Sequence, residues 1–215
     1  MPYTLAIFDF DGTLADSFAS FIHALNDAAV KYTFRSVGEQ EIELLRHLDA
    51  SKALEYLGVA KRKLPLISRY VRSRMMKDIS QISLFEGTDR LLEQLAARGV
   101  TLAIVSASRS ADVRRILGPR NQTLVQHFAC GAAFLSKRFK LRQLVRRSSV
   151  GPFELILIGD QIADLLAARA ENIPFGAVSW GFNSGESLRR HSPDFQFEFM
   201  DEILQKVPWC NRSEQ

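Results

Sequence analysis

Residues 5–14 read LAIFDFDGTL, in which the run Leu5–Phe10 is apolar except for Asp9 and ends in Asp11-Gly12-Thr13. Further along the chain, other short apolar runs also end in polar residues or glycine: Leu102–Val105, Cys130–Leu135, Leu155–Ile158 and Phe175–Val178. Continuous apolar runs of this length are typical of parallel strands whose two faces are both covered. The opening stretch therefore predicts the first strand of a parallel sheet.

Helical segments separate these apolar runs. Thr88 is a candidate cap for a helix over residues 89–98 that stops at Gly99, and Ser110 for one that ends at Gly118-Pro119. A further helix is expected over residues 160–170. Strand and helix in repeated alternation predict an α/β fold with a doubly wound parallel sheet.

The stretch from Phe18 to about Ser83 departs from this alternation. It contains no good strand candidate, and its apolar spacing predicts helices over Phe18–Val30, Glu39–Leu48, Ser51–Leu57 and Arg62–Ile79. We therefore expect a helical insertion, joined to the rest of the chain by connectors near Leu14–Ser17 and Ile82–Gly87.

Composition narrows the class of protein. The 215 residues are 47% hydrophobic and 24% charged, which excludes wholesale disorder and a disulfide miniprotein. No apolar run is long enough to cross a membrane, the N-terminal residues do not resemble a signal peptide, and the two cysteines lie far apart. These features predict a cytoplasmic protein with no membrane partner.

The net charge of +4 raises the question of a nucleic-acid partner. Basic residues gather in Lys61–Lys77 and Lys137–Arg147, where they alternate with apolar residues at helical spacing. This pattern favours the solvated faces of two amphipathic helices over a nucleic-acid groove, and it also suits a small anionic substrate. No motif indicates an oligomeric state.

Charged and hydroxyl side chains follow the predicted strands. Ligands of open α/β sheets bind beyond the carboxyl ends of the strands, so these side chains should meet at one edge: Asp9, Asp11, Ser106, Lys137, Asp160 and, one turn later, Asp164. Carboxylates this crowded need a cation, and oxygen ligands suit Mg²⁺ completed by a substrate phosphate. The spacing predicts a metal-dependent phosphate site.

The run Asp9-Phe10-Asp11-Gly12-Thr13-Leu14 resembles the first motif of the haloacid dehalogenase superfamily, on its phosphatase branch. Ser106, Lys137 and Gly159-Asp160-Gln161-Ile162-Ala163-Asp164 resemble the later motifs in the family's order. Residues 177–181 are similar to a segment of the phosphoglycolate-phosphatase-like group. The resemblance implies an α/β core domain over residues 1–16 and 84–215, with an α-helical cap domain over residues 17–83.

The resemblance also implies a mechanism. Asp9 would form an aspartyl-phosphate, Asp11 would act as general acid and base, and Mg²⁺ would be held by Asp9, the backbone carbonyl of Asp11, Asp160 and Asp164. Substrate contacts would come from Gly12, Thr13, Ser106, Ala107 and Lys137. The substrate would be a small phosphorylated metabolite, phosphoglycolate-like.

Several alternatives stay open on the sequence. Lys140 competes with Lys137 and Ser108 with Ser106, while Asp164 is either a positioning group for Lys137 or part of the metal site. Gln161 stands where many relatives carry an acidic or small residue, and residues 106–108 read Ser-Ala-Ser where many phosphoglycolate phosphatases have Thr-Asn.

Two other functions compete with a phosphatase: a phosphomutase with the same aspartyl-phosphate, and a non-catalytic binding protein on the same fold. Arg46 and Lys52 are candidates for contacts with an anionic substrate.

Overall fold

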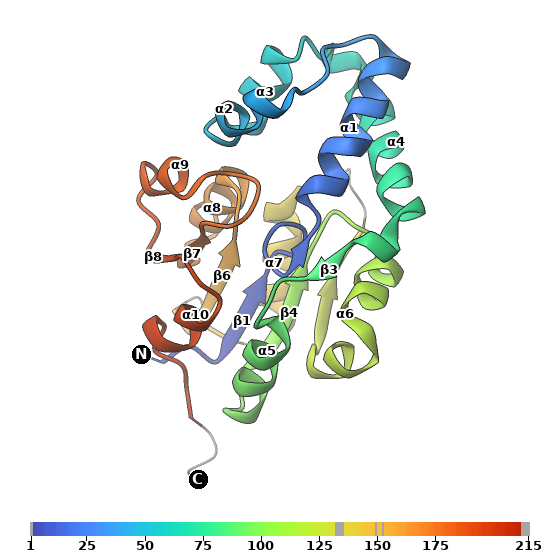
Figure 1. Cartoon of the computed structure of the whole chain (residues 1–215). Helices are drawn as coiled ribbons and strands as arrows, with labels where there is room; N and C mark the ends of the chain where they lie inside the picture. The colour runs from blue at the N-terminus through green and yellow to red at the C-terminus, as the bar shows by residue number, and fades with distance from the viewer. Residues whose placement is uncertain (1, 132–135, 149, 152, 212–215) are drawn as a thin grey trace.

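The computed structural model describes residues 2–131, 136–148, 150–151 and 153–211. Within these residues the central sheet has six parallel strands, in the order β5 (His127–Ala129), β4 (Thr101–Val105), β1 (Leu5–Phe8), β6 (Leu155–Gly159), β7 (Phe175–Val178) and β8 (Phe195–Phe197). β1 lies at the centre, with Leu5 opposite both Thr101 of β4 and Leu155 of β6. The predicted doubly wound α/β fold is confirmed (Figure 1).

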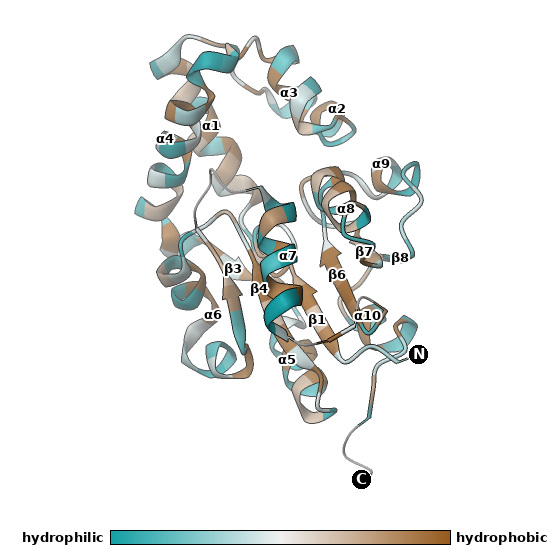
Figure 2. Ribbon diagram, turned by 180° about the vertical axis from the view of Figure 1, so that it is seen from behind, coloured by the Kyte–Doolittle hydropathy of each residue, from teal (hydrophilic) through white to brown (hydrophobic). Residues whose placement is uncertain are grey.

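Both faces of the sheet are covered by helices. Ala6 and Phe8 of β1 belong to one apolar cluster, with α5 (Thr88–Ala97), α6 (Ser110–Leu124) and α10 (Asp201–Lys206). Leu5 and Ile7 belong to the other, with α7 (Lys137–Ser148), α8 (Ile162–Arg169) and α9 (Gly185–Arg189). This double burial explains why β1 is an uninterrupted apolar run, and Figure 2 shows the hydrophobic strands between the helices.

A helical segment lies between two short strands, β2 (Ala15–Asp16) and β3 (Ser83–Leu84), which pair antiparallel. Its main helices are α1 (Phe18–Tyr32), α2 (Ile42–Arg46), α3 (Ala50–Tyr56) and α4 (Leu64–Lys77), joined by the 3₁₀ turns Glu39–Glu41, Lys61–Lys63 and Ile79–Gln81. α1 and α4 pack side by side, with Arg74 Nε 2.6 Å from Asp27 Oδ2. The segment stands over the carboxyl ends of the strands (Figure 1).

Some local predictions were wrong. Thr88 is the first residue of α5 and not its cap; Gly87 precedes it with φ 85°, and Thr88 Oγ1 donates instead to the Leu14 carbonyl. Arg109 is the N-cap of α6 and Ser110 its first residue, and that helix breaks at Gly118 but resumes to Leu124.

The strand expected over Cys130–Leu135 is also misplaced. The strand beside β4 is His127–Ala129, which ends before Cys130, and residues 132–135 lie outside the described residues. The sequence prediction missed β8 altogether. In the part of the chain that the structure describes, no helix has the length and apolar character required to span a membrane.

Candidate active site

The loop after β1 is shaped around a buried carboxylate from β6. Gly12 has φ 82°, and a Cβ at this position would lie 2.4 Å from Asp160 Oδ2, so only glycine fits. The next residue, Thr13, is fully buried and donates from Oγ1 to Asp160 Oδ1 at 2.8 Å. The sequence Asp-Gly-Thr thus brings the end of β1 against the end of β6, and Asp9 and Asp160 come together.

Three of the predicted carboxylates converge. Asp9, Asp160 and Asp164 are all buried, and each offers a carboxylate oxygen within 4.8 Å of the others. Burial, and then the charges of Asp9 and Asp164, raise the pKa of Asp160 well above its usual range. Burial also raises the pKa of Asp164 to about 7, against the opposing effect of Lys137. The carboxylates therefore crowd more negative charge than one lysine balances.

These donors fit a hard divalent cation. They are oxygen atoms only, and they come from two strand ends and the first turn of α8. Carboxylate oxygens of this kind suit Mg²⁺, Ca²⁺ or Mn²⁺.

A single ammonium group lies among these carboxylates. Lys137 Nζ is 2.9 Å from Asp9 Oδ2, and it also forms an ion pair with Asp164. Burial opposes the charge of Lys137, but the two carboxylates outweigh it, so its pKa is raised. Lys140, the alternative to Lys137 in the sequence, makes a different contact: its Nζ donates to the Ser106 carbonyl at 2.7 Å, and burial lowers its pKa. The structure therefore brings Lys137, and not Lys140, to Asp9.

Asp11 is held by the two serines of the Ser-Ala-Ser sequence. Ser108 Oγ donates to Asp11 Oδ2 at 2.7 Å, and Ser106 Oγ donates to the same oxygen at 3.3 Å. Ser106 Oγ in turn accepts from the Ser108 N–H at 2.9 Å. Burial raises the pKa of the Asp11 carboxyl, partly countered by the Ser108 hydrogen bond. An acid that keeps its proton to higher pH is suited to proton transfer near neutrality.

The carboxylates open into a cavity of about 480 Å³ beneath the helical segment. Asp9, Asp11, Lys137 and Asp164 form part of its wall, together with Ala107 and Ser108. Gln161, which stands where many relatives carry an acidic or small residue, also lines this wall, and its backbone N–H donates to Asp164 Oδ2 at 3.2 Å. Most of the remaining wall comes from α1, α3 and α4.

Of the two basic residues proposed for substrate contact, only one borders the cavity. Arg46 lines it, but its Nη2 donates to the carbonyls of Ser179, at 3.3 Å, and Gly181, at 3.1 Å. Lys52 is exposed, does not line the cavity and pairs with Asp49 at 3.5 Å.

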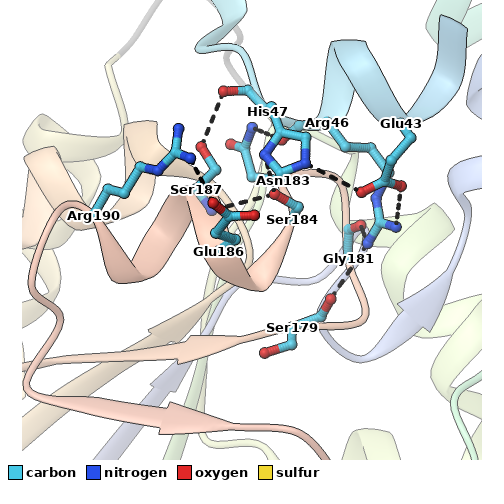
Figure 3. A network of polar contacts seen from close by, with 10 residues as sticks. All are labelled: Glu43, Arg46, His47, Ser179, Gly181, Asn183, Ser184, Glu186, Ser187 and Arg190. Carbon is cyan, nitrogen blue, oxygen red and sulfur yellow. Dashed lines mark hydrogen bonds and ion pairs between the residues drawn. The ribbon is translucent and has the colours of Figure 1, made fainter.

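A polar network ties α2 to the loop after β7, as Figure 3 shows. Asn183 Nδ2 donates to the carbonyls of Arg46, at 3.0 Å, and Leu48, at 2.8 Å. Ser187 Oγ donates to the His47 carbonyl at 3.1 Å, and Ser184 Oγ lies 3.0 Å from His47 Nδ1. Carbonyls at the end of a helix have no partner within the helix, so this loop completes α2 and fixes one wall of the cavity.

The sequence prediction did not find the loop 180–183, which supports Asp160 from the other side. The Phe182 N–H donates to Asp160 Oδ2 at 2.7 Å, and Trp180 Nε1 donates to the Thr13 carbonyl at 3.1 Å. Gly181 passes so close that a Cβ would lie 2.2 Å from that of Asp160. The glycine in Trp180-Gly181 was the available signal, because an isolated glycine after a strand often marks a close backbone approach.

Fold and site together define an α/β enzyme whose reacting groups lie at the carboxyl edge of a parallel sheet. The sequence model of the haloacid dehalogenase-like hydrolases matches residues 6–178, and the chain belongs to this family. The predicted family membership is confirmed.

Relatives agree with this assignment. A phosphoglycolate phosphatase from Synechococcus elongatus is 30% identical over 202 residues, which cover 94% of this chain and 95% of the relative. A 5′-nucleotidase from Pseudomonas aeruginosa is 25% identical over 204 residues, which cover 90% of each protein.

A solved structure supports the fold. A haloacid dehalogenase-like hydrolase from Streptococcus pneumoniae matches with a TM-score of 0.80 over 95% of this chain and 98% of that one, at 22% identity. The chain is an enzyme of the phosphatase type within its family, as the sequence predicted.

Proposed function

We propose that this enzyme is a Mg²⁺-dependent phosphatase that hydrolyses a small phosphate monoester through an aspartyl-phosphate on Asp9. One observation carries the proposal: the Lys137 ammonium lies 2.9 Å from Asp9 Oδ2, within a cluster of buried carboxylates that need a further cation. The phosphoglycolate phosphatase among its relatives supports the same chemistry.

Asp9 serves as the nucleophile in this proposal. A bond forms between its carboxylate oxygen and phosphorus, and the bond from phosphorus to the leaving oxygen breaks. Lys137 pairs with the Asp9 carboxylate and offsets charge on the phosphoryl group. Ser106 and the backbone of Gly12, Thr13 and Ala107 surround the phosphoryl oxygens.

Asp11 serves as the general acid and base in this proposal. Its raised pKa lets it carry a proton, which passes to the leaving oxygen in the first step. In the second step the ionised Asp11 takes a proton from water, the water oxygen attacks phosphorus, and inorganic phosphate leaves Asp9. Ser106 and Ser108 orient the Asp11 carboxyl for both transfers.

The metal would be held by Asp9, the backbone carbonyl of Asp11, Asp160 and Asp164. When bound, Mg²⁺ supplies positive charge that lets an anionic carboxylate approach an anionic phosphate. The hydrogen bonds from Thr13 Oγ1 and the Phe182 N–H would orient the Asp160 carboxylate toward the proposed metal position.

We further propose that the chain consists of a core domain of residues 1–16 and 84–215 and a helical cap domain of residues 17–83, as the family resemblance implied. The cap excludes water from the reaction when it lies over the cavity. The free thiols of Cys130 and Cys210 suit a reducing cytoplasm as the place of action.

Hydrolysis of p-nitrophenyl phosphate tests this function. We expect release of inorganic phosphate with Mg²⁺, loss of activity with a chelator, and no activity in Asp9→Asn although that variant folds. Turnover that survives either treatment would reject the proposal. Formation of an isomeric phosphate ester in place of inorganic phosphate would favour a phosphomutase.

A further inference from the structure

The cavity has an apolar half opposite its carboxylates. α1, α3 and α4 line this half with hydrophobic side chains, among them Phe21, Ile22, Leu54, Ile67, Val71 and Met75. The acidic groups of the cavity all belong to the proposed reaction centre. A substrate whose phosphate reaches Asp9 must therefore place the rest of its structure against an apolar wall.

Among the residues that the structure describes, two basic side chains border the cavity besides that of Lys137, and they belong to Arg46 and Arg72. The Arg46 guanidinium is engaged by two backbone carbonyls and lies 3.2 Å from Glu43 Oε2 (Figure 3). Arg72 has no ion-pair partner among the residues that the structure describes, and it lies in the last two turns of α4, the end of the helix from which the chain returns to the core through β3 (Figure 1). Arg72 thus lies toward the phosphate end of the cavity.

We propose that the leaving group of the substrate is an uncharged alkyl or aryl group, larger than the carboxylate-bearing group of phosphoglycolate. This inference rests on the proposed phosphatase function and specifies its substrate class. Arg72 then adds positive charge for the phosphate, and the helices α1, α3 and α4 contact the apolar group.

Size and polarity both argue for such a substrate. The volume of about 480 Å³ falls in the range of roughly 300–1,000 Å³ that holds drug-sized ligands, whereas a glycolate group would fill only a small part of it. A carboxylate against the apolar side chains of α1 and α3 would lose its hydration without gaining a partner there. An alkyl chain there gains from each methylene that it buries.

A substrate series tests this inference with the unmodified enzyme. We expect kcat/KM for n-alkyl phosphates with Mg²⁺ to rise about two- to fourfold for each added methylene, from ethyl until the cavity is filled. Hexyl phosphate should then be a better substrate than 2-phosphoglycolate. A preference for 2-phosphoglycolate, or the same kcat/KM along the series, would overturn the inference while leaving the phosphatase function intact.

A binding measurement tests the inference even if no ester is hydrolysed, a result that would reject the proposed function alone. Calorimetric titration should show n-octylphosphonate binding at least about tenfold more tightly than phosphonoacetate. Equal or weaker binding of n-octylphosphonate would contradict the apolar subsite.

Leu54 allows a matched pair of variants, because it lines the cavity and is only half-buried. Leu54→Lys should raise KM for hexyl phosphate by a factor at least about tenfold larger than the factor for ethyl phosphate. Leu54→Met, which keeps the volume and the apolar character, should stay within about threefold for both substrates. Equal effects of Leu54→Lys on the two substrates would count against the proposal.

Discussion

Replacement of Lys137 by methionine removes the cation that lies between Asp9 and Asp164. The methionine keeps most of the apolar stem of the side chain, so the change isolates the charge. Both carboxylates are buried, whereas the Lys137 side chain keeps 21% of its surface exposed. Breaking a buried ion pair costs about 3–5 kcal/mol, and this partial exposure places the expected loss near the lower end, about 3 kcal/mol.

The loss should depend on pH. The pKa of Asp164 is raised to about 7 even with Lys137 present, and it rises further when that cation is gone. A carboxyl whose pKa is higher in the folded than in the unfolded protein contributes stability that is fully present below the unfolded pKa and is lost as the pH rises to the folded pKa. The free energy of unfolding of Lys137→Met should therefore fall more steeply above neutral pH than that of the wild type.

Urea denaturation at mildly acidic and mildly alkaline pH, with and without Mg²⁺, measures this effect. Mg²⁺ should restore much of the lost stability, because it supplies charge to the same carboxylates. Lys140→Met is the matched control: Lys140 is also buried, but it bonds the Ser106 carbonyl, so its loss should cost about 1–3 kcal/mol without the added pH dependence. A Lys137→Met protein as stable as the wild type at alkaline pH would refute the reasoning.

Three further predictions concern the support of the site. Gly181→Ala would place a Cβ 2.2 Å from that of Asp160, so activity should fall at least about tenfold. The control Gly38→Ala, whose new Cβ would have its nearest neighbour 3.3 Å away, should keep its activity. Equal activities of the two variants would be inconsistent with a close fit at Gly181. Asn183→Ala removes three hydrogen bonds, two to the carbonyls of Arg46 and Leu48 and one from the Ile162 N–H, so it should cost about 1–3 kcal/mol of stability and raise KM; an unchanged KM would separate the network from substrate binding. Hydrogen bonds from Arg142 and Arg138 lower the pKa of Glu171 to about 2. Glu171→Gln should therefore be less stable than the wild type by up to about 1 kcal/mol above about pH 4.5, and this difference should vanish as the pH falls to about 2. A difference in stability that persists in acid would argue against these ion pairs.

The central strands could be predicted because both of their faces are buried. β1, β4, β6 and β7 are covered by helices on each side, so their buried residues are apolar and the runs stand out in the sequence. β8 is a short strand at the edge of the sheet and contains the half-buried Gln196, so its sequence carries no such run. β5, at the other edge, was misplaced for the same reason.

The convergence of Asp9, Asp160 and Asp164 was predictable from topology, because parallel strands end at one edge of the sheet. The contacts of the Ser108 hydroxyl were not predictable from topology. Ser108 reaches Asp11 because the loop after β4 turns its N–H onto Ser106 Oγ, and that geometry has no counterpart in strand or helix spacing. Nor does the spacing reveal that the loop 180–183 closes on Asp160, since its contact is a backbone N–H.

Chemical trapping of a phosphorylated carboxylate tests the central claim most directly. Enzyme quenched in acid during turnover of a phosphate monoester with Mg²⁺, and then reduced with borohydride, should yield a peptide in which residue 9 has become homoserine. The same treatment of Asp9→Asn should yield none. Rapid hydrolysis with no modified residue, or with the modification at another carboxylate, would contradict the assignment of Asp9 as the nucleophile.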